Sequence, residues 1–458
     1  MKILMSAVGA TDPVRGGYDG AMLHIARRRR PDMVCLFISR EMLDLDAVDH
    51  RYQRAFDMLA DQTDGYRPEI RRIEMASLID PSQIGACDRR FREEIKKLRA
   101  EKGEDAEFLL NLSSGTPQMK DSLKQICLEE TPNIEGIQVT SPGRRSNQEH
   151  TTTSAGYDLD AELENNYDSL PDAEDRTREP DLTYDRRGVT ISQIRKLNER
   201  FDYAASCLLM KGVILTDEDS VTLKILEYAR DRLDLQPSAG THLKYLPDDL
   251  RAALIRTQLN RLYDYALLLD CLARNGRVSE FIIRLNPMVI ELEKAYLEKV
   301  LGLRLPDYCC EYKDKTGETH YTISRNSLER FDPDLLTSLE SHMGRTLADG
   351  DPSQFVLKHL LAALLEKRAA APEQLKALEF FEACLTINRQ QRNDIAHDLT
   401  AATEESVIAQ SGGYSVADFN RGVQAALRQI DRRVSPARFG EDNPYAIINS
   451  TVSERLFL

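Results

Sequence analysis

The chain has 458 residues and a net charge of −14, with 41% hydrophobic residues, 30% charged residues and no tryptophan. Its length predicts two or three domains, and its composition is typical of a soluble globular protein. The acidic balance argues against a protein that binds DNA stably through a broad basic face. No apolar run reaches the roughly 20 residues that a membrane span needs, and the short apolar start, Met1–Met5, is not a secretory signal.

The eight cysteines form neither a C-x-x-C pair nor a Cys/His spacing that suits zinc. In a chain of this length they are expected to be reduced thiols, which favours a cytoplasmic protein. We therefore expect no metal site and no cofactor, and we expect any catalysis to be independent of metal ions.

The first 142 residues alternate β-rich apolar runs with amphipathic stretches. The runs expected to be strands are Ile3–Val8, Met33–Ser39, Ile70–Ala76, Phe108–Leu112 and Ile134–Thr140. The stretches expected to be helices are Ala21–Arg29, Glu41–Asp61, Ile84–Ala100 and Gln118–Glu129. This alternation predicts a Rossmann-like α/β domain with a parallel, doubly wound sheet. Ligands bind such sheets at the carboxyl ends of the strands, which directs attention to the loops after the first and fourth strands.

The composition changes between Glu149 and Asp185, where twelve acidic residues accompany only two basic ones. This segment is either a flexible linker or an irregular extension wrapped on the first domain. From Thr190 onward the pattern is almost wholly helical, apart from a short hairpin or loop at Tyr308–Ser324. The expected helices are Ser192–Met210, Ser220–Leu233, Asp248–Asn275, Pro287–Leu301, Leu335–Met343, Ser353–Ala370, Glu373–Leu385 and Val416–Val434. We divide the chain into an α/β domain (1–145), the acidic extension or linker (146–187), a helical connecting domain (188–285) and a C-terminal helical domain (286–458).

Two loops of the α/β domain carry candidate ligand-binding residues. The loop after the first strand departs from the G-x-G-x-x-G fingerprint, so a nicotinamide enzyme is not expected. In the loop after the fourth strand, Thr116 suits the N-cap and Pro117 the first position of a helix. That loop is either only a well-capped helix start or a place where hydroxyls and free amides bind an anion, such as a phosphodiester or adenylate. The candidates are Gly9, Ala10, Thr11 and Asp12 of the first loop and Ser113, Ser114, Gly115, Thr116, Pro117 and Gln118 of the second.

Arg392, Asn393 and His397 form the stretch most suited to catalysis. Histidine transfers protons near neutral pH, and arginine binds phosphate through the planar set of donors on its guanidinium. Such residues are also common on solvated helices, where they have no catalytic role. In a regular helix, positions five apart point about 140° away from each other, so a cleft containing both groups calls for two helices across a two-fold axis. Asn393 lies four residues before His397 and can be its neighbour. Arg389 either adds phosphate contacts or is a solvated surface residue.

These motifs together resemble the CARF–HEPN ancillary CRISPR ribonucleases of type III-A systems, the sixth Csm protein family. The likeness to the CARF domain rests on Ser6-Ala7-Val8-Gly9, Thr11-Asp12-Pro13, Ala21–Ile25 and Ser113–Met119, and the likeness to the HEPN domain on Arg392-Asn393-x-x-Ala396-His397. The resemblance covers nearly the whole chain. It implies a CARF domain over 1–145 and a HEPN ribonuclease domain over 286–458, acting as a homodimer. It further implies that a cyclic oligoadenylate bound by the CARF dimer activates metal-independent cleavage of single-stranded RNA.

Within this resemblance, Arg392 is expected to neutralise charge at the scissile phosphate, His397 to transfer protons and Asn393 to orient a group or contact the ribose. The second loop favours cyclic hexaadenylate over tetraadenylate as the activator. Ala10 stands where relatives often carry a polar side chain, which weighs against efficient cleavage of the activator by the CARF domain. The alternatives are a ligand-responsive transcription regulator, which requires a basic winged helix after the linker, and a helical scaffold without nuclease activity.

Overall fold

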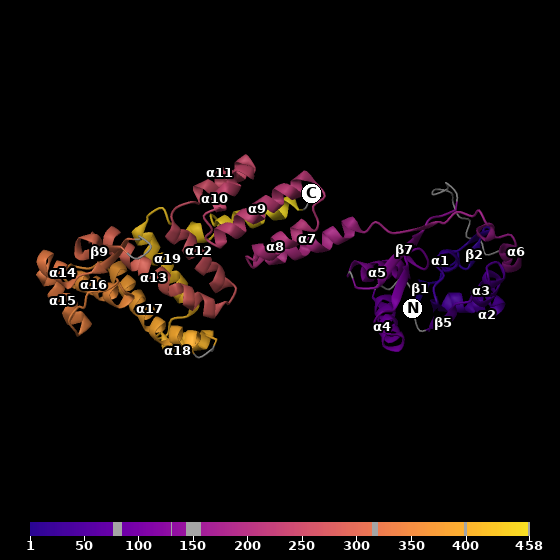
Figure 1. The fold of residues 1–458 in the computed structure, drawn as a ribbon, viewed down its shortest axis with the longest axis horizontal. Helices are drawn as coiled ribbons and strands as arrows, with labels where there is room; N and C mark the ends of the chain where they lie inside the picture. Colours follow the sequence, from indigo (N-terminus) through magenta and orange to yellow (C-terminus); the bar gives the residue numbers. More distant parts are fainter. Residues whose placement is uncertain (77–84, 130, 143–156, 314–318, 398–400, 457–458) are drawn as a thin grey trace. The chain divides into compact units, whose positions relative to one another are not determined.

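The computed structural model describes residues 1–76, 85–129, 131–142, 157–313, 319–397 and 401–456. Within these ranges the side chains of residues 86, 312–313, 319–320 and 390–397 are not described. The chain divides into two compact units, Met1–Arg186 and Arg187–Leu458, and each is considered by itself (Figure 1). Among the described helices none is long and apolar enough to cross a membrane.

The first unit is built on a six-stranded sheet with the order β5-β4-β1-β6-β7-β8. The strands from β5 to β7 pair in parallel, and β8 pairs antiparallel with β7. The strands are β1 (Lys2–Ala7), β4 (Met33–Ser39), β5 (Glu69–Met75), β6 (Glu107–Asn111), β7 (Ile134–Val139) and β8 (Thr177–Arg178), with a small separate hairpin of β2 (Val14–Arg15) and β3 (Tyr18–Asp19). The predicted parallel, Rossmann-like sheet is confirmed, and each predicted strand ends within one residue of its observed position.

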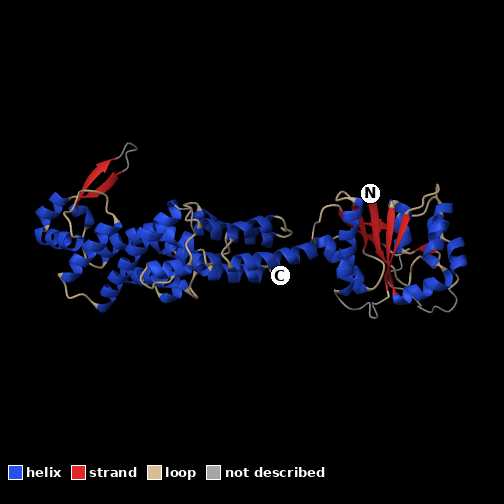
Figure 2. Cartoon of the chain, turned by 90° about the horizontal axis from the view of Figure 1, so that it is seen from below, coloured by secondary structure: helices blue, strands red, loops and turns tan. Residues whose placement is uncertain are grey.

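Helices flank the sheet on both sides (Figure 2). They are α1 (Ala21–Arg29), α2 (Arg40–Asp49), α3 (Arg51–Asp61), α4 (Ala86–Lys102), α5 (Pro117–Leu128) and α6 (Leu159–Glu164). Because side chains alternate along a strand, β1 contributes to two cores. Leu4 packs with apolar residues of α1, α3 and α6, whereas Ile3 and Met5 pack with those of α4 and α5. The sheet is therefore doubly wound.

The single helix expected over Glu41–Asp61 is wrong, because the chain forms α2 and α3 there. The break falls at His50, whose φ of 51° is left-handed. Asp46 stabilises the break, since its carbonyl accepts the His50 N–H and its carboxylate accepts the Tyr52 N–H at 3.2 Å. Aspartate hydrogen-bonds its neighbouring backbone readily and so competes with a continuous helix.

The described part of the acidic segment is an extension packed on the first unit. Its α6 buries Leu159 and Leu163 in the same core as α1 and α3. After η1 (Tyr167–Ser169) the chain adds β8 to the edge of the sheet. The composition left open a flexible linker or an extension wrapped on the first domain. Residues 157–182 form the wrapped extension.

A buried polar network fixes this extension to α1. The Asp168 carboxylate accepts hydrogen bonds from Arg176 at 2.6 Å and from the Asp19 N–H at 2.8 Å. The imidazole of His24 accepts the Arg176 N–H at 3.0 Å, and Arg27 pairs with Asp19 at 2.6 Å. Burial raises the pKa of Asp168, but hydrogen bonds from His24 and Arg176 outweigh this and lower it to about 2. Asp19, His24 and Asp168 lie close enough to hold a metal ion, but both carboxylates are already paired with arginines.

The second unit begins within α7 (Thr183–Glu199) and is almost wholly helical. The expected hairpin is present as β9 (Cys309–Lys313) and β10 (Thr319–Ile323). Its helices are α8 (Tyr203–Lys211), α9 (Asp217–Leu233), α10 (Ala239–His242), α11 (Asp248–Arg256), α12 (Arg261–Arg274), α13 (Val278–Lys299), α14 (Arg325–Phe331), α15 (Pro333–Met343), α16 (Gln354–Glu366), α17 (Pro372–His397), α18 (Glu404–Gln410), α19 (Val416–Ile430) and α20 (Pro444–Arg455). Short 3-10 turns are η2 (Leu243–Tyr245), η3 (Leu305–Tyr308) and η4 (Pro436–Phe439).

Two helices predicted as continuous are divided in the structure. Ser192–Met210 is interrupted between α7 and α8, where Phe201 has a left-handed φ of 58° and Asp202 caps α8. Asp248–Asn275 is interrupted between α11 and α12, where the Asn260 side chain accepts the Tyr263 N–H at 2.9 Å. In both cases a capping side chain begins the second helix.

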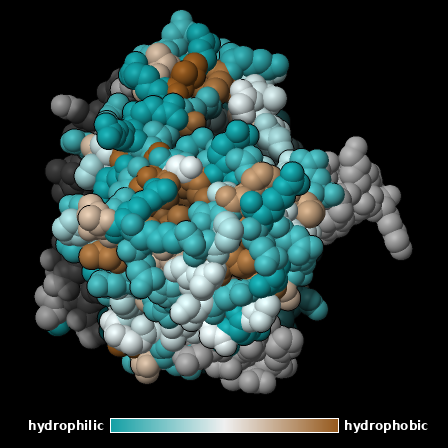
Figure 3. Space-filling view, turned by 90° about the vertical axis from the view of Figure 1, so that its left-hand side faces the viewer, coloured by the Kyte–Doolittle hydropathy of each residue, from teal (hydrophilic) through white to brown (hydrophobic). Residues whose placement is uncertain are grey.

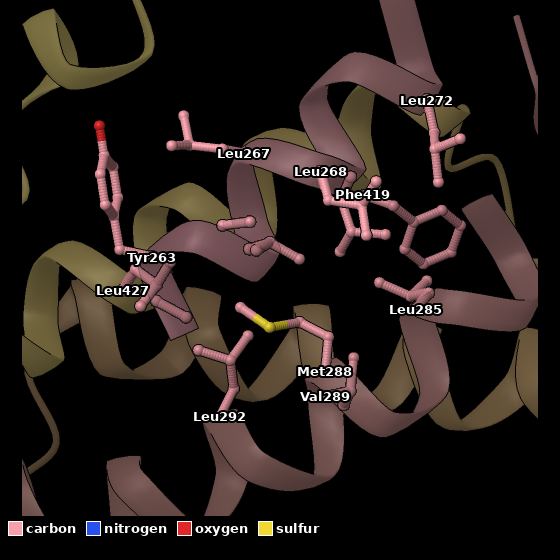
Figure 4. Close-up of a cluster of buried hydrophobic side chains, with 14 of the residues drawn as sticks. Tyr263, Leu267, Leu268, Leu272, Leu285, Met288, Val289, Leu292, Phe419 and Leu427 are labelled. Atoms are coloured by element: carbon pink, nitrogen blue, oxygen red, sulfur yellow. The ribbon is translucent and has the colours of Figure 1, made fainter. Parts of the chain in front are cut away.

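The centre of the helical unit is an apolar cluster between α12, α13 and α19 (Figure 4). Leucines of α12 and α13 meet Phe419 and Leu427 of α19 there, and both α19 residues are fully buried. In the space-filling view of the end that carries α14 and α15, the surface is mainly hydrophilic, with small separate hydrophobic patches (Figure 3). The helical unit thus has a contiguous core of its own, as a domain needs.

We predict that Asp168→Ala loosens the extension, because it leaves the buried Arg176 without its carboxylate partner. Removing one member of a buried ion pair costs about 3–5 kcal/mol. Thermal denaturation and limited proteolysis of the full chain should show a lower midpoint and new cleavage within residues 157–182. Asp172→Ala is the matched control, since Asp172 lies in the same extension but is exposed. An equal effect of both substitutions would contradict the assigned role of the network.

Candidate functional site

The loops after β1 and β6 meet at one end of the first unit's sheet. β1 and β6 are adjacent parallel strands, and the chain proceeds from them toward opposite edges of the sheet. Their carboxyl ends therefore form the topological switch point at which doubly wound sheets bind ligands. Gly9 and Gly115 allow the loops to touch, because a Cβ on Gly9 would lie 3.1 Å from the Gly115 nitrogen. Gly115 also has a φ of 88°, which favours glycine.

Asp12 connects the two loops from beneath. Its side chain is 1% exposed, and its carboxylate accepts hydrogen bonds from the Gly9 N–H at 2.9 Å and the Met22 N–H at 3.3 Å. The hydroxyl of Ser114 donates to the same carboxylate at 3.2 Å. Burial raises the pKa of Asp12 to about 6, against the lowering effect of these three donors. Asp12 and Ser114 were predicted as ligand-binding residues, and the structure buries both as supports of the loops.

The other hydroxyls of the second loop also have structural partners. Thr116 is the N-cap of α5, as predicted, and its hydroxyl oxygen accepts the Met119 N–H at 3.3 Å. The Ser113 hydroxyl accepts the Val139 N–H at 2.8 Å, which ties the loop to β7. Pro117 occupies the first position of α5, as predicted. These contacts fix the loop before any ligand binds.

The residues that face outward at this end are mostly those that offer backbone groups. Among the candidates, Ala10, Thr11 and Pro117 are exposed. The half-buried candidates are Gly9, Ser113, Gly115, Thr116 and Gln118. The outward surface of the candidate site is therefore built from loop backbone, the α5 N-terminus and a few hydroxyl and amide side chains. A helix N-terminus attracts anions through its partial positive charge, so the arrangement suits a phosphate-containing ligand.

A supporting pair beneath the loops was not predicted from the sequence. Asn111, the last residue of β6, donates from its side chain to the Ser6 hydroxyl at 2.8 Å and accepts the Ser113 N–H at 2.9 Å. Asn111 is fully buried. A polar residue at the end of an otherwise apolar strand is the sequence signal that could have identified it.

The second candidate site lies at the C-terminal end of α17, which contains Arg392 and Asn393 and ends at His397. The backbone of this stretch is helical, but the three side chains lie outside the described residues. One turn before Arg392, the buried Asn388 donates from its amide to Asn286 of α13 at 3.1 Å and to Gln354 of α16 at 2.8 Å. These side-chain hydrogen bonds hold α17 at a fixed rotation against its neighbours.

A close contact with α19 also holds α17, and a buried carboxyl lies on the neighbouring helix α13. On α19, a Cβ at Gly422 would lie 2.1 Å from the ring of Phe380, so only glycine permits this approach of α17. Glu293 of α13 is fully buried, and burial raises its pKa well above the usual value despite the charge of Lys358. None of these three positions was predicted, because no local pattern distinguishes them from ordinary helix residues.

We predict that Asp12 makes the stability of the protein depend on pH. A carboxyl whose pKa is raised on folding contributes stability below its unfolded pKa of about 3.9, and this contribution is lost as the pH rises through about 6. Between pH 5 and pH 7.5 the thermal midpoint should fall more for the wild type than for Asp12→Asn. The exposed Asp44 supplies the control, Asp44→Asn, which should follow the wild type. Parallel pH curves for the wild type and Asp12→Asn would exclude this role.

Comparison with known proteins finds two domains of one family in this chain. Residues 73–177 match the Cas_Csm6 CARF domain, and residues 254–439 match the Cas_Csm6 HEPN domain. The chain is 27% identical over 449 residues to the CRISPR system endoribonuclease Csm6 of Mycobacterium tuberculosis, covering 94% of this chain and 99% of the relative. It is 29% identical over 417 residues to a Csm6 of Streptococcus thermophilus, covering 87% and 89%.

A solved structure shares the fold. Enterococcus italicus Csm6, solved bound to cyclic hexa-2′-fluoro-hexa-dAMP, aligns with 99% of this chain and 100% of its own, with a TM-score of 0.59 and 19% identity. The order of the matched domains agrees with the parallel-sheet unit followed by the helical unit. The chain therefore belongs to the Csm6 family of CRISPR-associated CARF–HEPN proteins.

Proposed function

We propose that the chain is a cyclic oligoadenylate-activated endoribonuclease that cleaves single-stranded RNA without a metal ion. The observation that carries this proposal is the presence, in one chain, of a loop site at the sheet's switch point and an Arg–His motif at the end of α17. Each lies in a unit that contains the matching domain of the same family. The relatives named above are endoribonucleases, which favours this function over a transcription regulator or an inactive scaffold.

The chemistry needs only the protein and the RNA. The ribose 2′-oxygen attacks the adjacent phosphorus, a 2′-O–P bond forms and the P–O5′ bond breaks, leaving a 2′,3′-cyclic phosphate and a 5′-hydroxyl. We assign to Arg392 the stabilisation of the charge that develops on the phosphate oxygens. We assign to His397 the proton transfers at the attacking and leaving oxygens, and to Asn393 the orientation of His397 or the ribose.

We propose that the active form is a homodimer. Arg392 and His397 are five positions apart on the helical backbone of α17, and one regular helix directs such positions about 140° apart. Two copies of α17 facing each other across a two-fold axis bring both pairs of side chains into one cleft. A single chain thus supplies half of the catalytic groups of each cleft.

We propose that the exposed and half-buried residues of the two loops, namely Gly9, Ala10, Thr11, Ser113, Gly115, Thr116, Pro117 and Gln118, bind the activator, and that Asp12 and Ser114 support them. Cyclic hexaadenylate is the favoured activator, because the related Enterococcus italicus Csm6 was solved with a cyclic adenylate analogue of six nucleotides. Slow cleavage of the activator at this end, by in-line attack of a ribose 2′-hydroxyl, is also part of the proposal.

We predict that the wild type, given the activator, cleaves single-stranded RNA in the presence of EDTA and leaves 2′,3′-cyclic phosphate ends. His397→Ala should lower the cleavage rate by about 10²–10⁴-fold, the usual contribution of general acid–base catalysis. A substrate with 2′-deoxyribose at the scissile position should resist cleavage, since it lacks the nucleophile. Sedimentation of both proteins should show the same dimer. Activity that chelators abolish and a divalent ion restores would contradict the metal-free mechanism.

We predict that Thr116→Ala weakens binding of cyclic hexaadenylate by about 10–100-fold, the value of one hydroxyl hydrogen bond to a charged phosphate of about 1.5–3 kcal/mol. Calorimetric titration should use the His397→Ala background with labelled hexaadenylate and tetraadenylate rings. Thr116→Ser is the control, because it keeps both the hydroxyl and the helix cap. Following the same labelled rings over hours tests for their slow cleavage at the N-terminal site. Equal affinities of Thr116→Ala and the parent would remove Thr116 from the ligand site.

A further inference from the structure

A cationic and aromatic cluster lies beside α17, one turn before the proposed catalytic motif. The guanidinium of Arg389 lies over the ring of Phe355 at 4.9 Å from its centroid, and the guanidinium of Arg345 lies over the same ring at 4.8 Å. Phe355 belongs to α16, Arg389 to α17, and Arg345 to the segment between α15 and α16. Both arginines are exposed. Three segments of the helical unit therefore converge on one ring.

The position of this cluster is fixed by its surroundings. Gln354 and Asn388, which immediately precede Phe355 and Arg389, are joined by the buried hydrogen bond of 2.8 Å between α16 and α17. The imidazole of His359, one turn after Phe355, packs edge-on against the same ring at 4.5 Å between ring centroids. Stacking on an aromatic face restricts the arginines further. The two guanidiniums are thus held by packing rather than left to sample the solvent.

Several basic side chains surround the cluster. Burial, and after it the nearby charges of Lys358, His342, Arg389 and Arg345, lower the pKa of His359 to about 4. Lys358 pairs with Glu382 and His342 with Glu366. Among the residues that the structure describes, no carboxylate forms an ion pair with Arg345. In a chain with a net charge of −14, an exposed guanidinium with no described carboxylate partner, as at Arg345, suits an anionic ligand.

The cluster is continuous with the proposed active site. Positions 389, 393 and 397 are spaced by four residues and succeed one another along one side of the helical backbone of α17. An RNA strand that continues from the Arg–His motif along this side of α17 would pass Arg389 and, over the same ring, Arg345. Arg345, which lies over an aromatic ring and pairs with no described carboxylate, presents a planar guanidinium of the kind that binds phosphate through two N–H groups.

We propose that Arg345 and Arg389, held on Phe355, form a phosphate-binding subsite that extends the RNA cleft beyond the scissile bond. The inference rests on the proposed ribonuclease function and specifies how that site holds its substrate. The subsite contacts the sugar–phosphate backbone, so it contributes affinity without selecting a base. It lies outside the reacting atoms, so its loss should raise KM more than it lowers kcat.

The test measures RNA binding by full-length His397→Ala, which is expected to leave the RNA uncut. Anisotropy of a fluorescent single-stranded RNA of mixed sequence, titrated at several salt concentrations, gives both Kd and its salt dependence. Adding Arg345→Ala or Arg389→Ala should weaken binding about tenfold each, the value of one charged hydrogen bond. Each lost phosphate contact should also reduce the slope of log Kd against log salt by about 0.7.

Arg330→Ala is the matched control. Arg330 is another exposed arginine over a phenylalanine, 5.5 Å from the ring of Phe331, but it lies on α14, which packs against α15 and η3. It should leave RNA affinity and salt dependence unchanged. Arg345→Lys should keep the salt slope while losing part of the affinity, because lysine keeps the charge but not the planar fork.

Two results would overturn the inference. The subsite would be refuted if Arg345→Ala and Arg389→Ala left RNA affinity unchanged in the His397→Ala background. If the same substitutions also left RNA cleavage intact in proteins that keep His397, the proposed function would stand. Dissociation of the dimer by the same substitutions, seen by sedimentation, would identify the cluster as a contact with a second copy instead. Failure of the wild type to cleave RNA with either activator would refute the proposed function itself.

Discussion

The two loops of the candidate ligand site in the first unit depend on one buried carboxylate. Asp12 accepts hydrogen bonds from its own loop, from the first turn of α1 and from the loop before α5. Two segments near the N-terminus and a loop about 100 residues later thus share one acceptor group. Together with Asn111 and Ser113, this carboxylate fixes the position of the loops where Gly9 approaches Gly115. The outward surface is defined by what this side chain holds from below.

The helical unit fixes its candidate site in a comparable way. An apolar core is tolerant of small shifts, because many packings of leucines bury a similar area. Asn388, Asn286 and Gln354 restrict that freedom, since a rotation of α17 leaves buried amides unsatisfied. Gly422 adds a steric limit through its contact with Phe380. Hydrogen bonds and close packing therefore set the orientation of the helix that carries Arg392 and His397.

The sequence predicted the features of the fold that depend on the periodicity of apolar residues and on composition. The five parallel strands were found because alternating apolar runs bounded by loops identify buried strands. The N-cap at Thr116 was found because its chemistry is local. The break at His50 was missed, because it depends on one left-handed residue and the hydrogen bonds of Asp46 rather than on any loss of amphipathic spacing. Phe201 and Asn260 divided two further helices for the same kind of reason.

The meeting of the two loops was predictable from the sequence, but the direction of each side chain was not. The switch-point rule brought the two loops together correctly. It could not distinguish Ser114, whose hydroxyl turns inward to Asp12, from Thr11, which is exposed. Likewise, His24 is packed against the extension because Arg176 and Asp168, about 150 residues later, fold back over it. Such contacts depend on tertiary structure, and a single sequence contains no local signal for them.

Asp12 also connects ligand binding with protonation in the proposed function. Burial raises its pKa to about 6, so the carboxyl changes its charge in the range just below neutral pH. A phosphate bound at the loops above it disfavours the negative form and raises the pKa further, because like charges repel. Binding then takes up protons, and by linkage the affinity for a polyanion falls as the pH rises through this range. The carboxylate of Asp12, which holds the loops together, thus also opposes the binding of a negatively charged phosphate when it is ionised.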